Sequence, residues 1–526
     1  MTGSPPTVQF ESGIVQGLAL DGLEQYIEIP YGADTSGNGR FRPPAPVESW
    51  EGVRRADAWT TRAPQYLDGA IGRTPKQWFT IQGEYYAQGM SEDNLTVNIW
   101  TPDSKTGSRP VVFWIHGGGY TVGHAGSPMS DGAEFARRHD VVFVSVTHRL
   151  NAFGFLDLEG IAGPEFASSG LVGMLDLVAA LEWVQRNVAA FGGDPSSVTI
   201  IGESGGGGKV STLLVMDGVE GLFHRAVCES GVAMSANTAA DSEVYARGLI
   251  TELGGTDASV LFTASMQEIL DAQVRLERAQ PDLATPRPVM DGKRLPDYPE
   301  KIWASGGGSA VPVLAGSAHD EVAVFGAVDL DIDVHIPDFY RHGFGVGEPT
   351  LIDEGAGLAA LDRAAGKDAT SLVAQRRAAY PAESDSTIVQ TLLGDLFFRH
   401  PAIKLAEYRA ASGKQTWLYR LDWASPRIAP RGAPHSTSVS LFFDNTDLVG
   451  FAKGLADAEA VSRDMSGSLD AFIRNGSPSH GGIENWPPYT TENPAVMLFD
   501  VPSHLSVDPD GDIMRTLSEL ATKALM

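Results

Sequence analysis

The most constraining feature of this chain is a β-branched, apolar segment at residues 198–201 that runs directly into the sequence G-E-S-G-G at residues 202–206. A strand followed at once by G-x-S-x-G and a helix is typical of a sharp turn that strains the backbone of its serine and exposes the hydroxyl. Glycines at 202 and 206 leave room where a Cβ would meet neighbouring backbone. The chain holds 59 glycines, so the motif alone is equally consistent with a glycine-rich turn before a helix. The pattern indicates that Ser204 is a candidate nucleophile, and a second, independent motif is needed to support it.

A second glycine motif lies upstream, where the apolar run 111–115 ends in H-G-G-G at residues 116–119. A buried strand that ends in three glycines presents backbone N–H groups with no side chains in the way. In α/β-hydrolases such a loop builds the oxyanion hole together with the N–H of the residue after the nucleophile, here Gly205. Two such motifs in this order make a plain glycine turn the weaker reading.

Strand-like and helical patterns alternate along the chain. The strongest strand candidates are residues 111–115, 141–146, 198–202, 226–228, 311–315 and 416–421. Residues 171–191 form a long amphipathic helical pattern that ends in G-G-D-P. This alternation predicts an α/β fold with a mostly parallel central sheet flanked by helices. We expect one domain over residues 1–526, with helix-rich insertions at about 235–285 and 325–390 that form a lid or pocket wall.

Composition narrows the partners and the compartment. A net charge of −27 argues against nucleic acid or an anionic membrane as a partner, and is typical of a solvated acidic surface. We find no basic and apolar leader segment and no run of about 18 apolar residues that could span a membrane. The single cysteine, Cys228, allows no intrachain disulfide, and its apolar surroundings predict a packing role. These features predict a cytoplasmic protein.

Two cofactor readings fail. The run 205–209 ends in glycine and lysine as a phosphate-binding loop does, but Glu203 stands where that motif needs glycine, and Val210 where it needs Ser or Thr. No cluster of cysteine, histidine and carboxylate has the spacing of a metal site. We therefore expect neither a metal nor an organic cofactor.

A nucleophilic serine needs a histidine base and an acid, which follow it in the chain order Ser, acid, His in this fold. Among the twelve histidines, His435 follows the strand candidate 416–421, but His400, His480 and His342 remain alternatives. Glu321 follows the strand candidate 311–315, and its neighbour Asp320 competes for the acid's role.

The chain resembles the type-B carboxylesterases, the family that includes the cholinesterases, and is similar to its bacterial-type members. The matching stretches run in order from end to end: Y-I-E-I-P-Y at 26–31, R-F-x-P-P at 40–44, S-E-D-N-L-x-x-N-I-W-T-P at 91–102, H-G-G-G at 116–119, H-R-L-N-A-F-G-F at 148–155, A-L-E-W-V at 180–184, F-G-G-D-P at 191–195, G-E-S-G-G at 202–206, L-F-H-R-A at 222–226, D-G at 291–292, D-E at 320–321 and W-P-P-Y at 486–489.

The resemblance implies the α/β-hydrolase fold and a role for particular residues. Ser204 would be the nucleophile, Glu321 the acid and His435 the base, with oxyanion donors from the N–H groups of Gly118, Gly119 and Gly205. It also implies two structural ion pairs, Arg40–Glu92 and Arg149–Asp176.

Three departures from the family pattern stand out. Ala63 and Asn94 occupy the positions of the family's early disulfide, which agrees with a reducing compartment. The family usually reads H-G-x-E at the base, whereas residues 435–438 here read H-S-T-S. Four consecutive glycines at 205–208 cost helix stability, up to about 1 kcal/mol each, and close packing is the expected cause.

The predicted activity is hydrolysis of carboxylic esters through a Ser-Glu-His triad and an acyl-enzyme, with water as the second substrate. The alternative within enzymes is an amidase or carbamate hydrolase with the same triad. A more remote alternative is a non-catalytic, cholinesterase-like binding module, which the presence of Ser204 disfavours. The sequence leaves the ester, the pocket-lining residues and the oligomeric state open.

Overall fold

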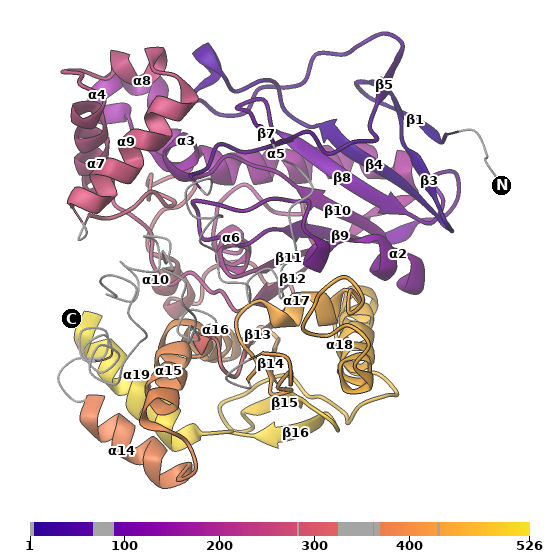
Figure 1. The fold of residues 1–526 in the computed structure, drawn as a ribbon, viewed down its shortest axis with the longest axis vertical. Helices are drawn as coiled ribbons and strands as arrows, with labels where there is room; N and C mark the ends of the chain where they lie inside the picture. The colour runs from indigo at the N-terminus through magenta and orange to yellow at the C-terminus, as the bar shows by residue number, and fades with distance from the viewer. Residues whose placement is uncertain are drawn as a thin grey trace. The chain divides into compact units, whose positions relative to one another are not determined.

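The computed structural model describes residues 5–66, 89–280, 283–323, 361, 369–428 and 432–525. These residues group into two compact units. Unit 1 contains the described residues up to 311 except 228–232, and unit 2 contains residues 228–232 and the described residues from 312 onward (Figure 1).

Unit 1 is built on a mixed sheet with the strand order β12-β11-β9-β10-β8-β4-β3. The strands β11, β9 and β10 are parallel, and β8, β4 and β3 continue the sheet in antiparallel pairing. Every residue of β10 is buried, as are the last five of β9, which is typical of parallel strands covered on both faces. The bounds are β3 (Leu18–Leu20), β4 (Leu23–Pro30), β8 (Thr96–Thr101), β9 (Arg109–Ile115), β10 (Val142–Val146), β11 (Gly193–Glu203) and β12 (Arg225–Glu229). Smaller sheets are formed by β1 (Thr7–Phe10), β2 (Gly13–Gln16) and β5 (Val53–Arg55), and by β6 (Thr61–Arg62) and β7 (Gly89–Met90).

Three helices of unit 1, α7, α8 and α9, contribute to one apolar cluster, which also includes residues from earlier in the chain. α7 and α9 each begin with a capping box, Thr238 with Asp241 and Ser265 with Glu268, which fixes where these helices start. Their buried faces and that of α8 share one hydrophobic cluster (Figure 1). The helices are α2 (Ala133–His139), α3 (Asn151–Phe155), α4 (Glu159–Ala162), α5 (Val172–Asn187), α6 (Gly205–Leu213), α7 (Ala239–Glu252), α8 (Ser259–Thr263), α9 (Met266–Ala279) and α10 (Pro299–Ala304). Short 3₁₀ turns are η1 (Gly37–Gly39), η4 (Pro128–Ser130), η5 (Pro164–Phe166), η6 (Ser169–Leu171) and η7 (Val188–Phe191).

The predicted helix over 171–191 is confirmed as α5 followed by η7, and it ends at Gly192 in a left-handed conformation with φ 81°. One expectation needs correction here. The segment Pro164–Phe191 is long and apolar enough to cross a membrane by length and composition, although no such run was expected. Its most apolar 18-residue window is 72% buried inside the protein, as in the core helix of a globular domain.

Unit 2 carries the strand order β16-β15-β14-β13, in which β13, β14 and β15 are parallel and β16 is antiparallel. Helices α14, α15 and α19 can be followed in Figure 1, and their apolar side chains share one buried cluster. The strands are β13 (Val313–Ala318), β14 (Thr416–Leu421), β15 (Ala495–Phe499) and β16 (His504–Val507). The helices are α14 (Ala369–Ala379), α15 (Asp385–Gly394), a π-helical turn η8 (Asp395–Arg399), α16 (His400–Ala411), α17 (Thr437–Phe442), α18 (Ala456–Asn475) and α19 (Gly511–Leu525).

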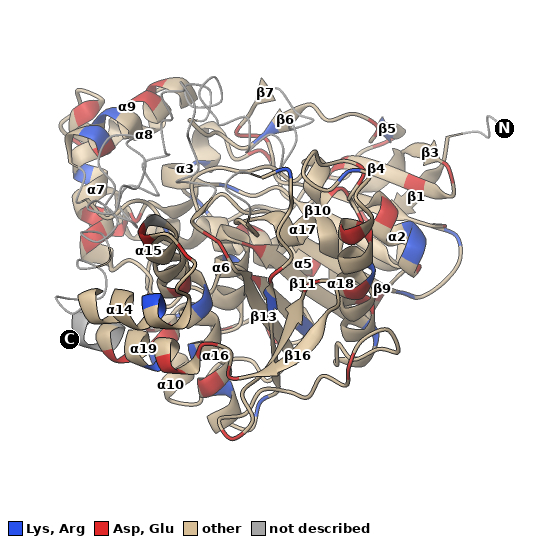
Figure 2. Ribbon diagram, turned by 60° about the horizontal axis from the view of Figure 1, so that its bottom comes forward, with Lys and Arg blue, Asp and Glu red and all other residues tan. Residues whose placement is uncertain are grey.

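The two predicted insertions are described to different extents. Residues 235–285 hold α7, α8 and α9, as the helical pattern predicts. Of residues 325–390, the stretches 325–360 and 362–368 lie outside the described residues, and the rest is mainly α14 and α15. The single domain and the role of the insertions as a lid stay predictions. Helices α7, α9 and α18 each carry both acidic and basic residues (Figure 2), which is typical of solvated helix faces.

Candidate active site

The turn around Ser204 has the strained geometry that its sequence predicts. Ser204 lies between the last residue of β11 and the first of α6, with φ 56° and ψ −124°. L-residues rarely adopt a positive φ, and such strain costs roughly 1–3 kcal/mol and tends to occur at functional sites. The flanking glycines are required by space, because a Cβ at Gly202 would lie 2.4 Å from the carbonyl carbon of Gly206. The turn therefore presents a serine in a conformation that the surrounding backbone enforces.

The loop of residues 116–119 lies directly against this turn, within unit 1. A Cβ built on Gly117 would lie 3.3 Å from the Cβ of Ser204, and one built on Gly205 only 2.0 Å from the carbonyl oxygen of Gly119. Gly118 and Gly119 have φ values of 88° and 64°, which favour glycine. Among the described residues, the backbone N–H groups of Gly118 and Gly119 have no hydrogen-bond acceptor. The structure thus brings together Ser204 and the three glycines that the sequence nominates as oxyanion donors.

Glu321 and His435 form a buried pair within unit 2. His435 Nδ1 lies 2.5 Å from Glu321 Oε2, and both side chains are about 1% exposed. The other carboxylate oxygen, Oε1, accepts a hydrogen bond from the N–H of Ala318 at the end of β13 over 2.7 Å. The ring of Phe398 packs on the imidazole, with 4.7 Å between centroids. A carboxylate on Nδ1 fixes the ring orientation and the tautomer, which leaves Nε2 to act as a base.

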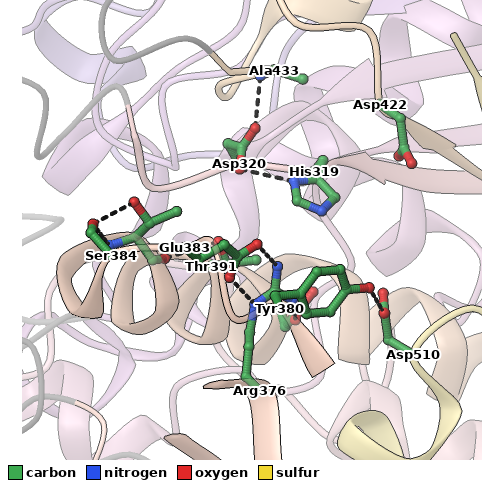
Figure 3. A network of polar contacts seen from close by, with 12 residues as sticks. His319, Asp320, Arg376, Tyr380, Glu383, Ser384, Thr391, Asp422, Ala433 and Asp510 are labelled. Atoms are coloured by element: carbon green, nitrogen blue, oxygen red, sulfur yellow. Dashed lines mark hydrogen bonds and ion pairs between the residues drawn. The ribbon is translucent and has the colours of Figure 1, made fainter. Parts of the chain in front are cut away.

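Asp320, the competing carboxylate, has other partners (Figure 3). Its Oδ2 accepts a hydrogen bond from the N–H of Ala433 over 2.9 Å, and its Oδ1 lies 2.8 Å from His319 Nδ1. Burial on its own raises the pKa of Asp320, but the His319 and Ala433 hydrogen bonds hold that pKa below its usual value. Asp320 therefore ties together two loops of unit 2, whereas its neighbour Glu321 contacts His435.

The alternative histidines have different surroundings. His480 uses both ring nitrogens, with Asp464 O at 3.2 Å and the N–H of Gly482 at 3.1 Å. Burial lowers the pKa of His400 to about 4. His342 lies outside the described residues.

The remaining predictions concern the scaffold, and the structure confirms them. Arg40 binds Glu92 through two hydrogen bonds of 2.5 and 2.6 Å, and Arg149 binds Asp176 at 2.6 and 2.8 Å. All four side chains are less than a tenth exposed. Cys228 is fully buried, and burial raises the pKa of its thiol to about 12, which suits packing rather than chemistry.

Sequence reasoning missed what surrounds the H-S-T-S segment. Ser436, where the family has glycine, has φ 70° and precedes α17. Ser438, where the family has glutamate, donates a hydrogen bond to the buried carboxylate of Glu229 over 3.0 Å. The unusual serines flagged these positions, but nothing in the pattern pointed to Glu229 as the partner.

Sequence reasoning also missed Lys209. It considered this lysine only within a phosphate-loop pattern that fails, and the side chain is fully buried beside the 116–119 loop.

Comparison with known proteins gives a consistent assignment. The chain matches the Carboxylesterase family over residues 4–512. It is 32% identical to the para-nitrobenzyl esterase of Bacillus subtilis strain 168, over 97% of this chain and 98% of that protein, and 32% identical to the liver carboxylesterase of Sus scrofa, over 93% and 88%.

Solved structures agree. A carboxylesterase of Geobacillus stearothermophilus superposes with a TM-score of 0.81 at 30% identity, over 97% of this chain and 99% of that one. These relatives bear out the predicted α/β-hydrolase fold, the bacterial-type resemblance and the class of reaction. The chain therefore belongs to the carboxylesterase family and is a serine carboxylesterase, a hydrolase of carboxylic esters.

Proposed function

We propose that this esterase acts through Ser204 as nucleophile, His435 as general base and Glu321 as the acid that orients His435. The N–H groups of Gly118, Gly119 and Gly205 are proposed to bind the oxyanion. One observation carries the proposal furthest: the strained Ser204 turn packs against a glycine loop in which two N–H groups lack an acceptor among the described residues. The proposal is also supported by the short hydrogen bond between His435 and Glu321, because a carboxylate on Nδ1 orients the imidazole as a base.

The proposed reaction has two halves. In the first, His435 Nε2 takes the hydroxyl proton as Ser204 Oγ attacks the ester carbonyl, and the negative charge that develops on the carbonyl oxygen is met by backbone N–H donors. His435 then gives the proton to the leaving alkoxide, and the alcohol departs. In the second half, water repeats the sequence on the acyl-enzyme and releases the acid. Glu321 stabilises the imidazolium in both halves.

Covalent labelling tests the nucleophile. A fluorophosphonate should modify Ser204 with a stoichiometry of one, and Ser204→Ala should lower kcat by roughly 10⁶-fold while the protein stays folded. The matched control is Ser211→Ala on the same helix, which should keep full labelling and near-normal kcat. Labelling at another residue, or an active Ser204→Ala protein, overturns the proposal.

A substrate panel tests the reaction class. We propose esters as substrates, with p-nitrophenyl esters of increasing acyl length compared with the matching anilides and carbamates. Higher kcat/KM for an anilide or a carbamate than for every ester of the series would instead favour the amidase or carbamate hydrolase alternative.

The proposal extends to cofactors, partners and cellular location. We propose that the enzyme uses no cofactor, binds neither nucleic acid nor membranes, and works in the cytoplasm. The net charge of −27 supports the proposal on nucleic acid and membranes, and the single, buried Cys228 supports the one on the cytoplasm.

A further inference from the structure

Lys209 is a buried cation that the proposed mechanism does not use. It lies on α6, the helix that starts after Ser204, and its side chain is fully buried. Its Nζ donates a hydrogen bond to the carbonyl oxygen of Gly119 over 2.9 Å and to that of His116 over 3.4 Å. Among the described residues no carboxylate forms an ion pair with it. Burying an ammonium without a counterion is costly, so its contacts with the glycine loop require an explanation.

The two carbonyls that Lys209 holds complete the anchoring of the loop. Within residues 116–119, the Gly117 carbonyl lies 2.9 Å from His116 Nδ1, and the Gly118 carbonyl accepts from the N–H of Val122 over 3.1 Å. All four carbonyl oxygens of the loop thus have a donor. Because a peptide unit is planar, fixing its C=O direction also fixes the direction of the next residue's N–H. Lys209 therefore fixes the two outer peptide units, 116–117 and 119–120, and the N–H groups of Gly118 and Gly119 belong to the two units between them. Within the described residues, Lys209 is the one side chain of α6 that donates a hydrogen bond to a carbonyl of this loop.

Gly205 and Lys209 act on the same carbonyl. They are four residues apart on α6 and therefore lie on one helix face. The Gly119 carbonyl oxygen lies so close to Gly205 that a Cβ at position 205 would be only 2.0 Å from it. Lys209 holds the same oxygen by a hydrogen bond. This arrangement gives the glycine at 205 a packing reason.

The titratable side chains around Lys209 are neutral, so the lysine carries the positive charge in this part of unit 1. The imidazoles of His116 and His148 stack with 4.8 Å between centroids, and burial together with the Lys209 charge holds the pKa of each well below its usual value. Lys209 Nζ also lies 5.6 Å from the centre of the Tyr120 ring, where a cation is favoured. Burial raises the pKa of Tyr120, which keeps its phenol neutral.

We propose that Lys209 is a positioning residue for ester hydrolysis: its ammonium group holds the carbonyls of His116 and Gly119, fixes the two peptide units that flank the N–H groups of Gly118 and Gly119, and adds positive charge beside the loop. The proposal rests on the proposed function of these glycines. Charge that is preorganised where an oxyanion forms stabilises the transition state more than the bound ester. Lys209 does not touch the substrate in this scheme.

Steady-state kinetics of Lys209→Met provide the main test, with Ser211→Ala as the matched control. Ser211 is also fully buried on α6, but its hydroxyl bonds the carbonyl of Gly208 and the N–H of Ala233 rather than the glycine loop. We expect Lys209→Met to lower kcat by roughly 10- to 100-fold with KM nearly unchanged, because donor alignment matters most in the transition state. Its Ki for a trifluoromethyl ketone, which forms a hemiketal oxyanion with the serine, should rise by a similar factor. A folded Lys209→Met enzyme with normal kcat and Ki overturns the proposal.

The pH profile separates this role from a structural one. Burial lowers the pKa of Lys209 to about 7, so the free enzyme loses the ammonium charge as pH rises through that region. His116, His148 and Tyr120, the titratable groups facing Lys209, are neutral across that range. The wild-type kcat/KM should therefore decline on its alkaline side, and Lys209→Met should lose that decline and keep the acid limb. An alkaline limb of the same size in Lys209→Met contradicts the proposal.

Two further measurements keep the outcome unambiguous. If Lys209→Met does not fold, Lys209→Gln is measured instead, since its amide keeps a donor for the Gly119 carbonyl but carries no charge. Fluorophosphonate labelling is run on the wild type in parallel. No label at Ser204 means that the proposed function has failed, whereas a labelled Ser204 with normal kcat in a folded Lys209 variant means that only this inference has failed.

Discussion

Ser438 Oγ donates a hydrogen bond to Glu229 Oε2 over 3.0 Å, and both side chains are fully buried in unit 2. The motif H-G-x-E, usual in the family that this chain resembles, would place a glutamate at position 438, where this chain has a hydroxyl. The buried carboxylate of this pair comes instead from the end of β12. The contact joins that strand end to α17, which begins two residues after His435.

Removing the Ser438 hydroxyl should destabilise the protein. Ser438→Ala takes one donor from a buried carboxylate, and hydrogen bonds to charged groups contribute about 1.5–3 kcal/mol. We expect a fall of that size in the free energy of unfolding, measured by urea denaturation. The control is Ser440→Ala on the same helix, because within the described part of the chain its hydroxyl bonds only the Thr437 carbonyl, over 3.3 Å, and its loss should cost less. Equal costs for the two variants would contradict this reading.

The acid can be assigned by two amide substitutions. Glu321→Gln should lower kcat/KM by up to about 10⁴-fold, because the amide favours the wrong tautomer of His435. Asp320→Asn should cost less than about tenfold and act through stability, since Asp320 holds Ala433 and His319 rather than the base. Both are measured on one activated ester beside thermal unfolding. A crippled Asp320→Asn enzyme with a mild Glu321→Gln would reverse the assignment.

The protein should be more stable with glycine than with alanine at position 436. The φ of Ser436, 70°, is strained for any L-residue, and both substitutions remove the hydroxyl. The comparison therefore isolates the backbone, and we expect Ser436→Gly to exceed Ser436→Ala by about 1 kcal/mol in unfolding free energy. Urea denaturation of the two variants provides the measurement, and an equal or more stable alanine variant would refute it.

The shared action of Gly205 and Lys209 predicts non-additive kinetics. Gly205→Ala places a Cβ against the Gly119 carbonyl and should lower kcat, because that carbonyl is held in place by Lys209. In a Lys209→Met background the carbonyl can shift, so the same alanine should cost several-fold less. A double-mutant cycle on kcat measures the coupling. Strict additivity would show that the two residues act independently.

Acid should weaken unit 2 through Asp510. Burial on its own raises the pKa of Asp510, but Arg399 and Arg420, at 2.9 and 2.7 Å, hold it well below its usual value. Tyr380 donates a further hydrogen bond (Figure 3). A lowered folded-state pKa contributes stability above the unfolded value of about 3.9, and that stability is lost as pH falls below it. The urea midpoint should therefore drop between pH 5 and pH 3 by more in the wild type than in Asp510→Asn; equal drops would contradict this.

Much of the fold could be predicted from local patterns. The strand β14 has the predicted bounds, and β13 starts two residues later than predicted because Pro312 has no N–H for the ladder. The strand β4 was missed because Glu28, with φ 56°, interrupts its alternation where the register shifts against β8.

The candidate site divides in the same way. Ser204 and the glycine loop of residues 116–119 follow from short motifs, since each depends on backbone near the residue itself. The choice of Glu321 and His435 comes from the family resemblance, because chain order alone leaves other residues open. Lys209 and Glu229 could not be predicted, because their roles depend on burial and on partners from distant segments. A lysine in a helix sequence is usually a solvated residue, and only tertiary packing shows otherwise.

The boundary between the units falls inside β12, since Val227 belongs to unit 1 and Cys228–Val232 to unit 2. A ribosome therefore delivers this short piece, which carries Glu229, long before the other described residues of unit 2, which start at Pro312. Domains generally fold as they emerge, amino terminus first. During synthesis the Glu229 carboxylate therefore exists without Ser438, its later hydrogen-bond partner. For the same reason, a chain truncated at Val311 would retain an orphaned strand end and aggregate more readily than the whole protein.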